Sequence, residues 1–118
     1  MLNGHELIQV GVNGEEQLVP DFRKNLSFKD LGNLISEADT AICVDSYLQH
    51  HFWANRKRAI VLFGVSDPLI FGHPENVNLL KDRKFLRENQ FDLYYSNQLC
   101  PEAFVSPQEV MDIVNKWQ

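Results

Sequence analysis

The chain contains 118 residues, of which 44% are hydrophobic and 23% are charged, and its formal net charge is -5. This length and composition are typical of one folded domain, so we expect residues 1–118 to form a single domain. The negative charge argues against a broad nucleic-acid or anionic-membrane surface, and no apolar run approaches the roughly 20 residues that a membrane span needs.

The N-terminal part of the chain predicts two strands. Residues 6–12 form the first strand, and a glycine-rich turn that contains Glu15 and Glu16 follows it. The two carboxylates are either solvated or placed so that one of them faces a ligand at the sheet edge. Residues 18–22 predict a weak second strand, because Pro20 has no N–H to donate to a ladder.

A helix follows with a clear start. Ser27 is a favourable N-cap residue, and apolar residues then recur at helical spacing until Asp39. The expected buried face of this helix consists of Phe28, Leu31, Leu34, Ile35 and Ala38.

The centre of the chain predicts a strand–helix–strand unit. Residues 41–44 read as a short buried strand, and residues 59–63 read as a second strand that ends in a loop at 64–68. The helix between them starts after Asp45-Ser46, runs to about Asn55, and is expected to bury Leu48, Phe52 and Trp53. Two strands joined by one helix require a parallel sheet, so we predict an α/β fold.

Ligands of such sheets bind beside the carboxyl ends of the strands, where Asp45, Ser46, His50 and the loop at 64–68 meet. The first amides of a helix attract a phosphate, to which Ser46 and His50 can each donate a hydrogen bond. The alternatives are that Asp45 is only an N-cap and that His50 is an ordinary surface or core histidine. His50 and His51 are adjacent, which does not suit a helical metal pair, and we expect no metal and no cofactor.

The remainder of the chain predicts further elements around this unit. The basic residues 56–58 are either a solvated turn or a phosphate site, and the apolar loop at 69–74 either packs over the sheet edge or meets a partner. A short strand is expected at 76–80, a helical or turn-like segment at 81–88, and a last strand or packed loop at 91–95. The final helix has Ser106 as its cap, Pro107 in first position and Glu109 to complete a capping box.

Cysteine use and the N-terminus indicate the compartment. Cys43 falls inside a predicted strand, where a thiol acts as a small buried hydrophobe, and Cys100 precedes a proline. We expect both cysteines to be reduced, and the first residues lack the features of a signal peptide. These observations predict a cytoplasmic protein.

Three ordered motifs resemble the C-terminal half of the heptosyltransferase family (glycosyltransferase family nine). The first is the helix that starts at Ser27 and ends Ala38-Asp39. The second is Val44-Asp45-Ser46-(x)3-His50, and the third is Leu62-Phe63-Gly64-(x)-Ser66-Asp67-Pro68.

The resemblance implies a Rossmann-like parallel sheet flanked by helices, like the C-terminal half of a GT-B glycosyltransferase. It also implies a nucleotide-sugar donor, most simply ADP-heptose, and a role in lipopolysaccharide biosynthesis. The transfer reaction of the family needs no metal. The implied donor-binding residues are Asp45, Ser46, Tyr47, His50, Glu15, Glu16, Ser66 and Asp67.

The chain departs from the family pattern at several positions. Tyr47, Lys24 and Val65 stand where the family has glycine, glycine and proline. The family's N-terminal domain, which holds the acceptor and the catalytic base, has no counterpart here, so we expect no transfer by this chain alone. The alternatives are a degenerate relative that acts as a protein interaction or oligomerisation module, and an unrelated small α/β protein. We expect a partner or a second copy of the chain to cover the open sheet edge.

Overall fold

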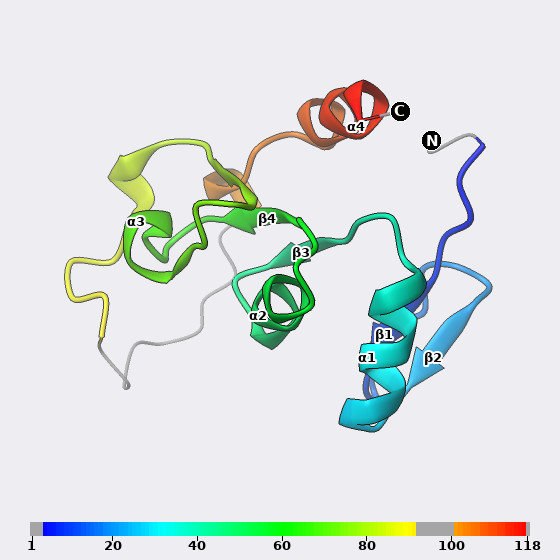
Figure 1. Ribbon diagram of the computed structural model, residues 1–118. Helices are drawn as coiled ribbons and strands as arrows, with labels where there is room; N and C mark the ends of the chain where they lie inside the picture. The colour runs from blue at the N-terminus through cyan, green and yellow to red at the C-terminus, as the bar shows by residue number, and fades with distance from the viewer. Residues whose placement is uncertain (1–3, 92–100, 118) are drawn as a thin grey trace. The chain divides into compact units, whose positions relative to one another are not determined.

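Parallel strands flanked by helices make up an α/β fold in the computed structural model, which describes residues 4–91 and 101–117 (Figure 1). The chain divides into two compact units, Met1–Glu37 and Ala38–Gln118. In the described part of the chain, no helix is long and apolar enough to cross a membrane.

The first unit is a parallel two-stranded ribbon with one helix beside it. Hydrogen bonds from Gln9 N to Asp21 O (2.9 Å) and from Asn25 N to Gly11 O (2.8 Å) close the two ends of the ribbon. The strand predicted at residues 18–22 was wrong, because pairing starts only after Pro20. The elements are β1 (Gln9–Gly11), β2 (Phe22–Lys24) and α1 (Phe28–Glu37).

The start of α1 confirms the predicted cap. Ser27 Oγ accepts a hydrogen bond from Asp30 N at 3.1 Å, and Leu31 and Ile35 are buried as expected. Phe28, however, is 80% exposed, so its predicted burial was wrong. Side chains of a helix lean toward its N-terminus, and that of the first helical residue therefore extends past the end of the helix.

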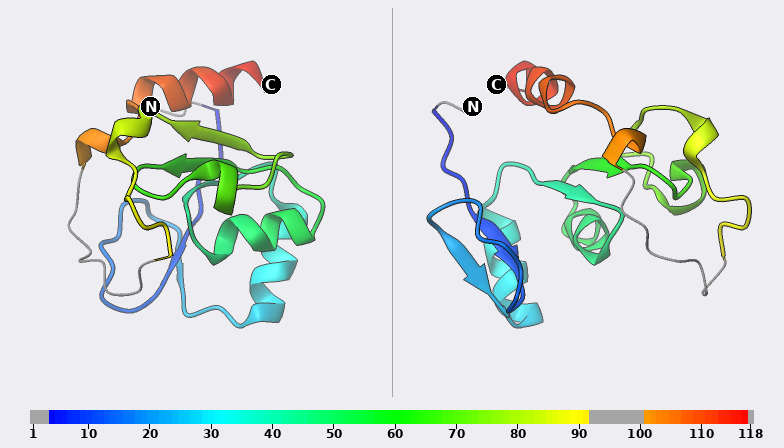
Figure 2. Two further views of the ribbon diagram at one scale, coloured as in Figure 1. Left: turned by 90° about the vertical axis from the view of Figure 1, so that its left-hand side faces the viewer. Right: turned by 180° about the vertical axis from the view of Figure 1, so that it is seen from behind.

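The second unit contains a three-stranded parallel sheet in the order β3-β4-β5, with α2 crossing from β3 to β4 and the short α3 crossing from β4 to β5 (Figure 2). This arrangement confirms the predicted strand–helix–strand unit and the parallel sheet. The register places Ile42 opposite Ile60 and Leu62 opposite Leu79. The elements are β3 (Ile42–Val44), α2 (Tyr47–Ala54), β4 (Ile60–Phe63), α3 (Pro68–Phe71) and β5 (Val77–Leu80).

The core of the second unit is centred on β4. Ile60, Val61 and Phe63 are almost completely buried, as the continuous apolar run of a central parallel strand requires. In contrast, Ile42 and Val44 of β3 are 41% and 51% exposed, so the prediction of a buried strand was wrong for these residues. The reason is that β3 is an edge strand of this sheet.

Helix α2 buries a different face from the predicted one. Phe52 is buried as expected, but Trp53 is 45% exposed. Gln49 and His51 are buried in its place. Gln49 precedes Phe52 by three residues, so both lie on one side of the helix.

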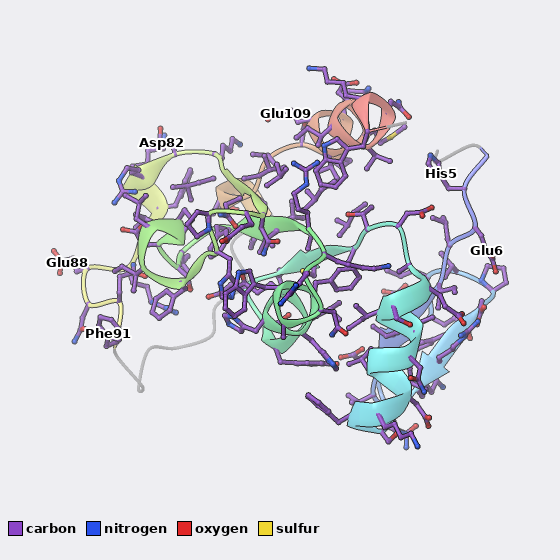
Figure 3. The ribbon with its side chains drawn as sticks, viewed as in Figure 1. His5, Glu6, Asp82, Glu88, Phe91 and Glu109 are labelled. Atoms are coloured by element: carbon purple, nitrogen blue, oxygen red, sulfur yellow. The ribbon has the colours of Figure 1, made fainter. Side chains whose placement is uncertain are left out.

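The loop predicted after β4 contains the short helix α3. Asp67 caps it by accepting a hydrogen bond from Leu69 N at 2.9 Å, and Pro68 occupies its first position. Phe91, labelled in Figure 3, makes an edge-to-face contact with Phe71 at a centroid distance of 5.5 Å.

The segments after β5 are mostly irregular. Single turns of 3-10 helix occur at Arg83–Phe85 and Pro101–Ala103, and α4 spans Pro107–Lys116 behind the predicted Ser106 cap. The possible strand at 91–95 lies outside the described residues except for Phe91, and Cys100 also lies outside them.

Candidate functional site

The turn between β3 and α2 is the centre of the candidate site. Ser46 is the N-cap residue and has an extended backbone (φ -155°, ψ 177°), but its side chain makes no capping hydrogen bond. The corresponding Ser106 of α4 does cap its helix, because its Oγ accepts from Glu109 N at 3.3 Å. The first turn of α2 also contains no acidic residue. Its N-terminal amides and partial positive charge are therefore suited to an external anion.

Asp45 has a partner that the sequence did not predict. Its Oδ1 accepts a hydrogen bond from Gln49 Nε2 at 2.5 Å, and the Gln49 side chain is completely buried. Gln49 Oε1 has no hydrogen-bond partner among the described residues. The pair ties the turn to the first turn of α2. The sequence did contain a signal for this hydrogen bond, because Gln49 is a polar residue four positions after Asp45.

Tyr47, at the start of α2, is 62% exposed, so its side chain is not packed into the edge of the sheet.

His50 belongs to an aromatic cluster that joins α2 to the segment after α3. His50 Nδ1 and His73 Nε2 form a hydrogen bond of 2.7 Å, with the two rings nearly perpendicular at 83°. The indole of Trp53 stacks on the His73 ring at a centroid distance of 4.5 Å and an angle of 9°. The sequence singled out His50, but it gave no reason to pair His73 with it, because that contact depends on how the 69–74 segment folds back.

Ser66 and Asp67 are held by residues that follow β5. Asp67 forms a two-pronged ion pair with Arg83, at 2.7 and 3.2 Å, and Ser66 Oγ accepts from Arg87 at 3.0 Å. The hydrogen bond from Arg83, followed by that from Leu69 N, lowers the pKa of Asp67. These bonds join the loop after β4 to the loop after β5.

Gln90 adds further bonds to the same junction. Its Oε1 accepts from Asp67 N at 2.8 Å, and its Nε2 donates to Val65 O at 3.0 Å. Both arginines lie in the segment 81–88, which the sequence described only as charged and helical or turn-like, and Gln90 follows that segment.

Glu15 and Glu16 belong to the first unit. Glu15 Oε2 accepts from Val12 N at 3.3 Å, and Glu16 O accepts from the Gln9 side chain at 2.8 Å. Both glutamates are exposed. Their roles beside a donor stay predictions.

Cys43 is the middle residue of β3. It is only partly buried, whereas the sequence predicted a fully buried thiol. Burial, with a smaller contribution from Asp45, raises the pKa of its thiol to about 11. A thiol that stays protonated at neutral pH is a poor nucleophile. Across residues 4–91 and 101–117, no three histidine, cysteine or acidic side chains are grouped to hold a metal ion.

The basic residues at the C-terminal end of α2 have structural contacts. Arg58 lies over the Trp117 ring at 4.5 Å, and Lys57 Nζ donates to Ala38 O at 2.5 Å. Arg56 adopts a left-handed backbone (φ 59°), which ends the helix. A shallow hollow of about 370 Å³ adjoins these residues and Trp53.

Comparisons with known proteins identify one family. A family model described as glycosyltransferase family 9 (heptosyltransferase) matches residues 24–94, which is more than half of the 118-residue chain. The matched region includes the turn before α2, His50 and the loop after β4. Searches of curated proteins and of solved structures found no match.

Proposed function

The chain belongs to glycosyltransferase family 9, the heptosyltransferase family, and from this premise we propose that its second unit binds the diphosphate of a nucleotide-sugar donor. By family resemblance the expected donor is an ADP-sugar of the heptose type, and the unit would correspond to the donor half of a GT-B enzyme. The observation that carries the proposal is the N-terminus of α2, where Ser46 leaves the helix amides without a side-chain cap.

The electrostatics of this turn favour a phosphate group. The first amides of a helix have no acceptor within the helix, and the helix dipole adds partial positive charge at the same end. No carboxylate in the first turn of α2 neutralises that charge. Asp45, the nearest carboxylate in sequence, accepts the hydrogen bond of Gln49. An anionic ligand would thus be bound by backbone groups rather than by a lysine.

The proposed roles of the side chains follow from their positions on α2. Ser46 would donate its hydroxyl to a phosphate oxygen, and His50 would donate from its imidazole one turn further along the helix. Tyr47 would lie beside the phosphates, where its exposed ring limits how closely they approach the backbone.

The loop at 64–68 has a supporting role in this proposal. Because Asp67 is paired with Arg83 and Ser66 with Arg87, their side chains are already hydrogen-bonded within the protein. They would shape the edge of the site, and Glu15 and Glu16 would contribute on the nucleoside side as the family resemblance implies.

An amide NMR titration with ADP, UDP and GDP tests the proposal. We expect ADP to cause saturable shifts at Ser46, Tyr47 and Leu48, where the uncapped amides lie. The amides at the start of α4, where Ser106 already supplies a cap, are an internal control that should not shift. Absence of shifts at the α2 amides at millimolar nucleotide would contradict donor binding.

A second candidate function is protein interaction by a glycosyltransferase-like module. The exposed apolar side chains of Leu69 (83%), Phe91 (69%) and Tyr47 (62%) favour it, because apolar surface of this kind is often buried in an interface. A partner or a second copy of the chain would take the place of the donor as the main ligand.

A further inference from the structure

His73 lies between two residues of α2 that are three positions apart. His50 forms the 2.7 Å hydrogen bond with its Nε2, and Trp53 stacks on its ring at 4.5 Å. Because positions i and i+3 of a helix lie on the same side, both contacts come from one face of α2. His73 is half-buried, whereas His50 is exposed.

The backbone of His73 is anchored to the sheet. Its carbonyl accepts hydrogen bonds from Asn76 N at 3.0 Å and from Asn78 Nδ2 at 2.9 Å. Asn78 belongs to β5, and Asn76 Oδ1 in turn accepts from Ala59 N at 3.0 Å, immediately before β4. His73 is thus a fixed point against which the exposed ring of His50 is oriented.

The hydrogen bond between the two imidazoles also constrains where their protons lie. A neutral imidazole has one N–H and one acceptor nitrogen, so a single proton occupies the line between His50 Nδ1 and His73 Nε2. If His73 donates that proton, His50 accepts at Nδ1 and carries its own proton on Nε2. If His50 donates, its Nε2 is left as an acceptor, which repels a phosphate oxygen.

We propose that His73 is a positioning residue for His50: it donates from Nε2 to His50 Nδ1 and thereby holds His50 as an Nε2–H donor for an anionic ligand. The role of that ligand as the donor diphosphate rests on the proposed function, whereas the proton arrangement is a property of the free protein. Trp53 supports the arrangement by holding the His73 ring flat against its indole. In this proposal three residues of the second unit work together: His50 contacts the ligand, His73 orients His50, and Trp53 supports His73. Of the three, only His50 belongs to the family motif.

The first test is NMR of the protein with ¹⁵N-labelled histidine at about pH 8, where imidazoles are ordinarily neutral. We expect a coupling across the N–H···N hydrogen bond, with the proton bonded to His73 Nε2 and a second proton on His50 Nε2. A bridging proton bonded to His50 Nδ1, with a bare His50 Nε2, would overturn the proposal. This readout needs no ligand, so it does not depend on donor binding.

The second test uses variants and inorganic pyrophosphate as the probe. His73→Phe keeps a ring for Trp53 but removes the N–H, and we expect about tenfold weaker pyrophosphate binding, as for a lost hydrogen bond to a charged group. His73→Gln places an N–H donor near the same point and should bind within about threefold of the parent. His5→Ala, which removes a histidine of the first unit, is the matched control.

The outcomes separate the two proposals. If the parent protein binds neither ADP nor pyrophosphate, the proposal of donor binding is wrong. The NMR measurement on the protein without ligand still decides whether His73 determines which nitrogen of His50 carries the proton. If the parent binds pyrophosphate and His73→Phe binds it equally well, the positioning role is wrong while donor binding stands. Amide spectra of β4 and β5 confirm that each variant is folded.

Discussion

At the scale of single residues, Tyr47 separates the two proposed functions. The family has glycine at this position, which allows phosphates to approach the backbone closely. Tyr47 is 62% exposed, so it does not belong to the core. The sequence identified the substitution, but only the structure shows where the ring lies.

Tyr47→Gly should therefore strengthen nucleotide binding. We expect the Kd for ADP to fall by about tenfold, equivalent to one gained hydrogen bond between an amide and a phosphate. Isothermal titration calorimetry measures this change, and Tyr47→Phe is the matched control because it keeps the bulk of the ring. Equal or weaker ADP binding by a correctly folded Tyr47→Gly protein would show that the side chain does not limit the approach.

The Asp67–Arg83 ion pair predicts how stability depends on pH. Because Arg83 lowers the pKa of Asp67 below its ordinary value of 3.8, the folded state holds the carboxylate more strongly than the unfolded state does. The pair therefore stabilises the protein above about pH 4, and this stabilisation is lost as the pH falls through the lower pKa of the folded state.

Arg83→Gln should be less stable than the parent at pH 7, and the difference should shrink as the pH falls below 3.8 and through the lower pKa of Asp67 in the folded parent, because a protonated carboxyl group no longer pairs with Arg83. Urea unfolding at pH 7 and at a series of lower pH values measures this difference. Lys84→Gln removes the same charge from the neighbouring exposed position and should have little effect. A difference between Arg83→Gln and the parent that is independent of pH would mean that the ion pair is not its cause.

At the scale of elements, local chemistry predicted the capped helices and the strands of the second unit, but it missed β2 and α3. The caps at Ser27 and Ser106 located α1 and α4, because an N-cap is a contact within one turn. The position of β2 was missed, because a three-residue strand is set by its partner β1 rather than by its own composition. Helix α3 was missed although Asp67-Pro68 is a favourable start, because its apolar residues resembled a loop that covers the sheet edge.

The serines at the N-cap positions of α4 and α2 predict effects of different size on stability. Ser106→Ala should lower the free energy of unfolding by about 1 kcal/mol, because it removes the hydrogen bond to Glu109 N. Ser46→Ala should change it by less than about 0.5 kcal/mol, because Ser46 makes no capping bond. Chemical denaturation measures both values, and Ser106→Asp should retain the stability. An equal loss in the two alanine variants would contradict the uncapped state of α2.

At the scale of the whole molecule, the sequence predicted the α/β class because alternating strand and helix signals depend only on order along the chain. The candidate site was predicted in part for the same reason: the turn at Asp45-Ser46 and His50 lie within one strand–helix segment. His73, Arg83 and Gln90 could not be assigned, because their contacts with the site join segments about 16 to 23 positions apart.

The exposed edge strand of the second unit predicts that the chain associates with itself. The edge strand β3 exposes Ile42 and Val44, and a second copy of the chain could bury them. We expect sedimentation velocity to show a dimer at high concentration and Ile42→Lys to dissociate it. Val12→Lys adds the same charge at an exposed valine of the first unit and should leave the dimer intact. A monomer at every concentration would contradict the prediction.

The order of strands in the second unit also has a kinetic consequence. Each strand pairs with the next one in the chain, Ile42 with Ile60 and Ile60 with Val77, so every ladder closes across a single short crossover. Contacts that are this local in sequence favour fast folding despite the parallel geometry. During synthesis, we expect the sheet to assemble in the order in which its strands leave the ribosome, and to be complete once β5 has emerged, before α4 leaves the ribosome.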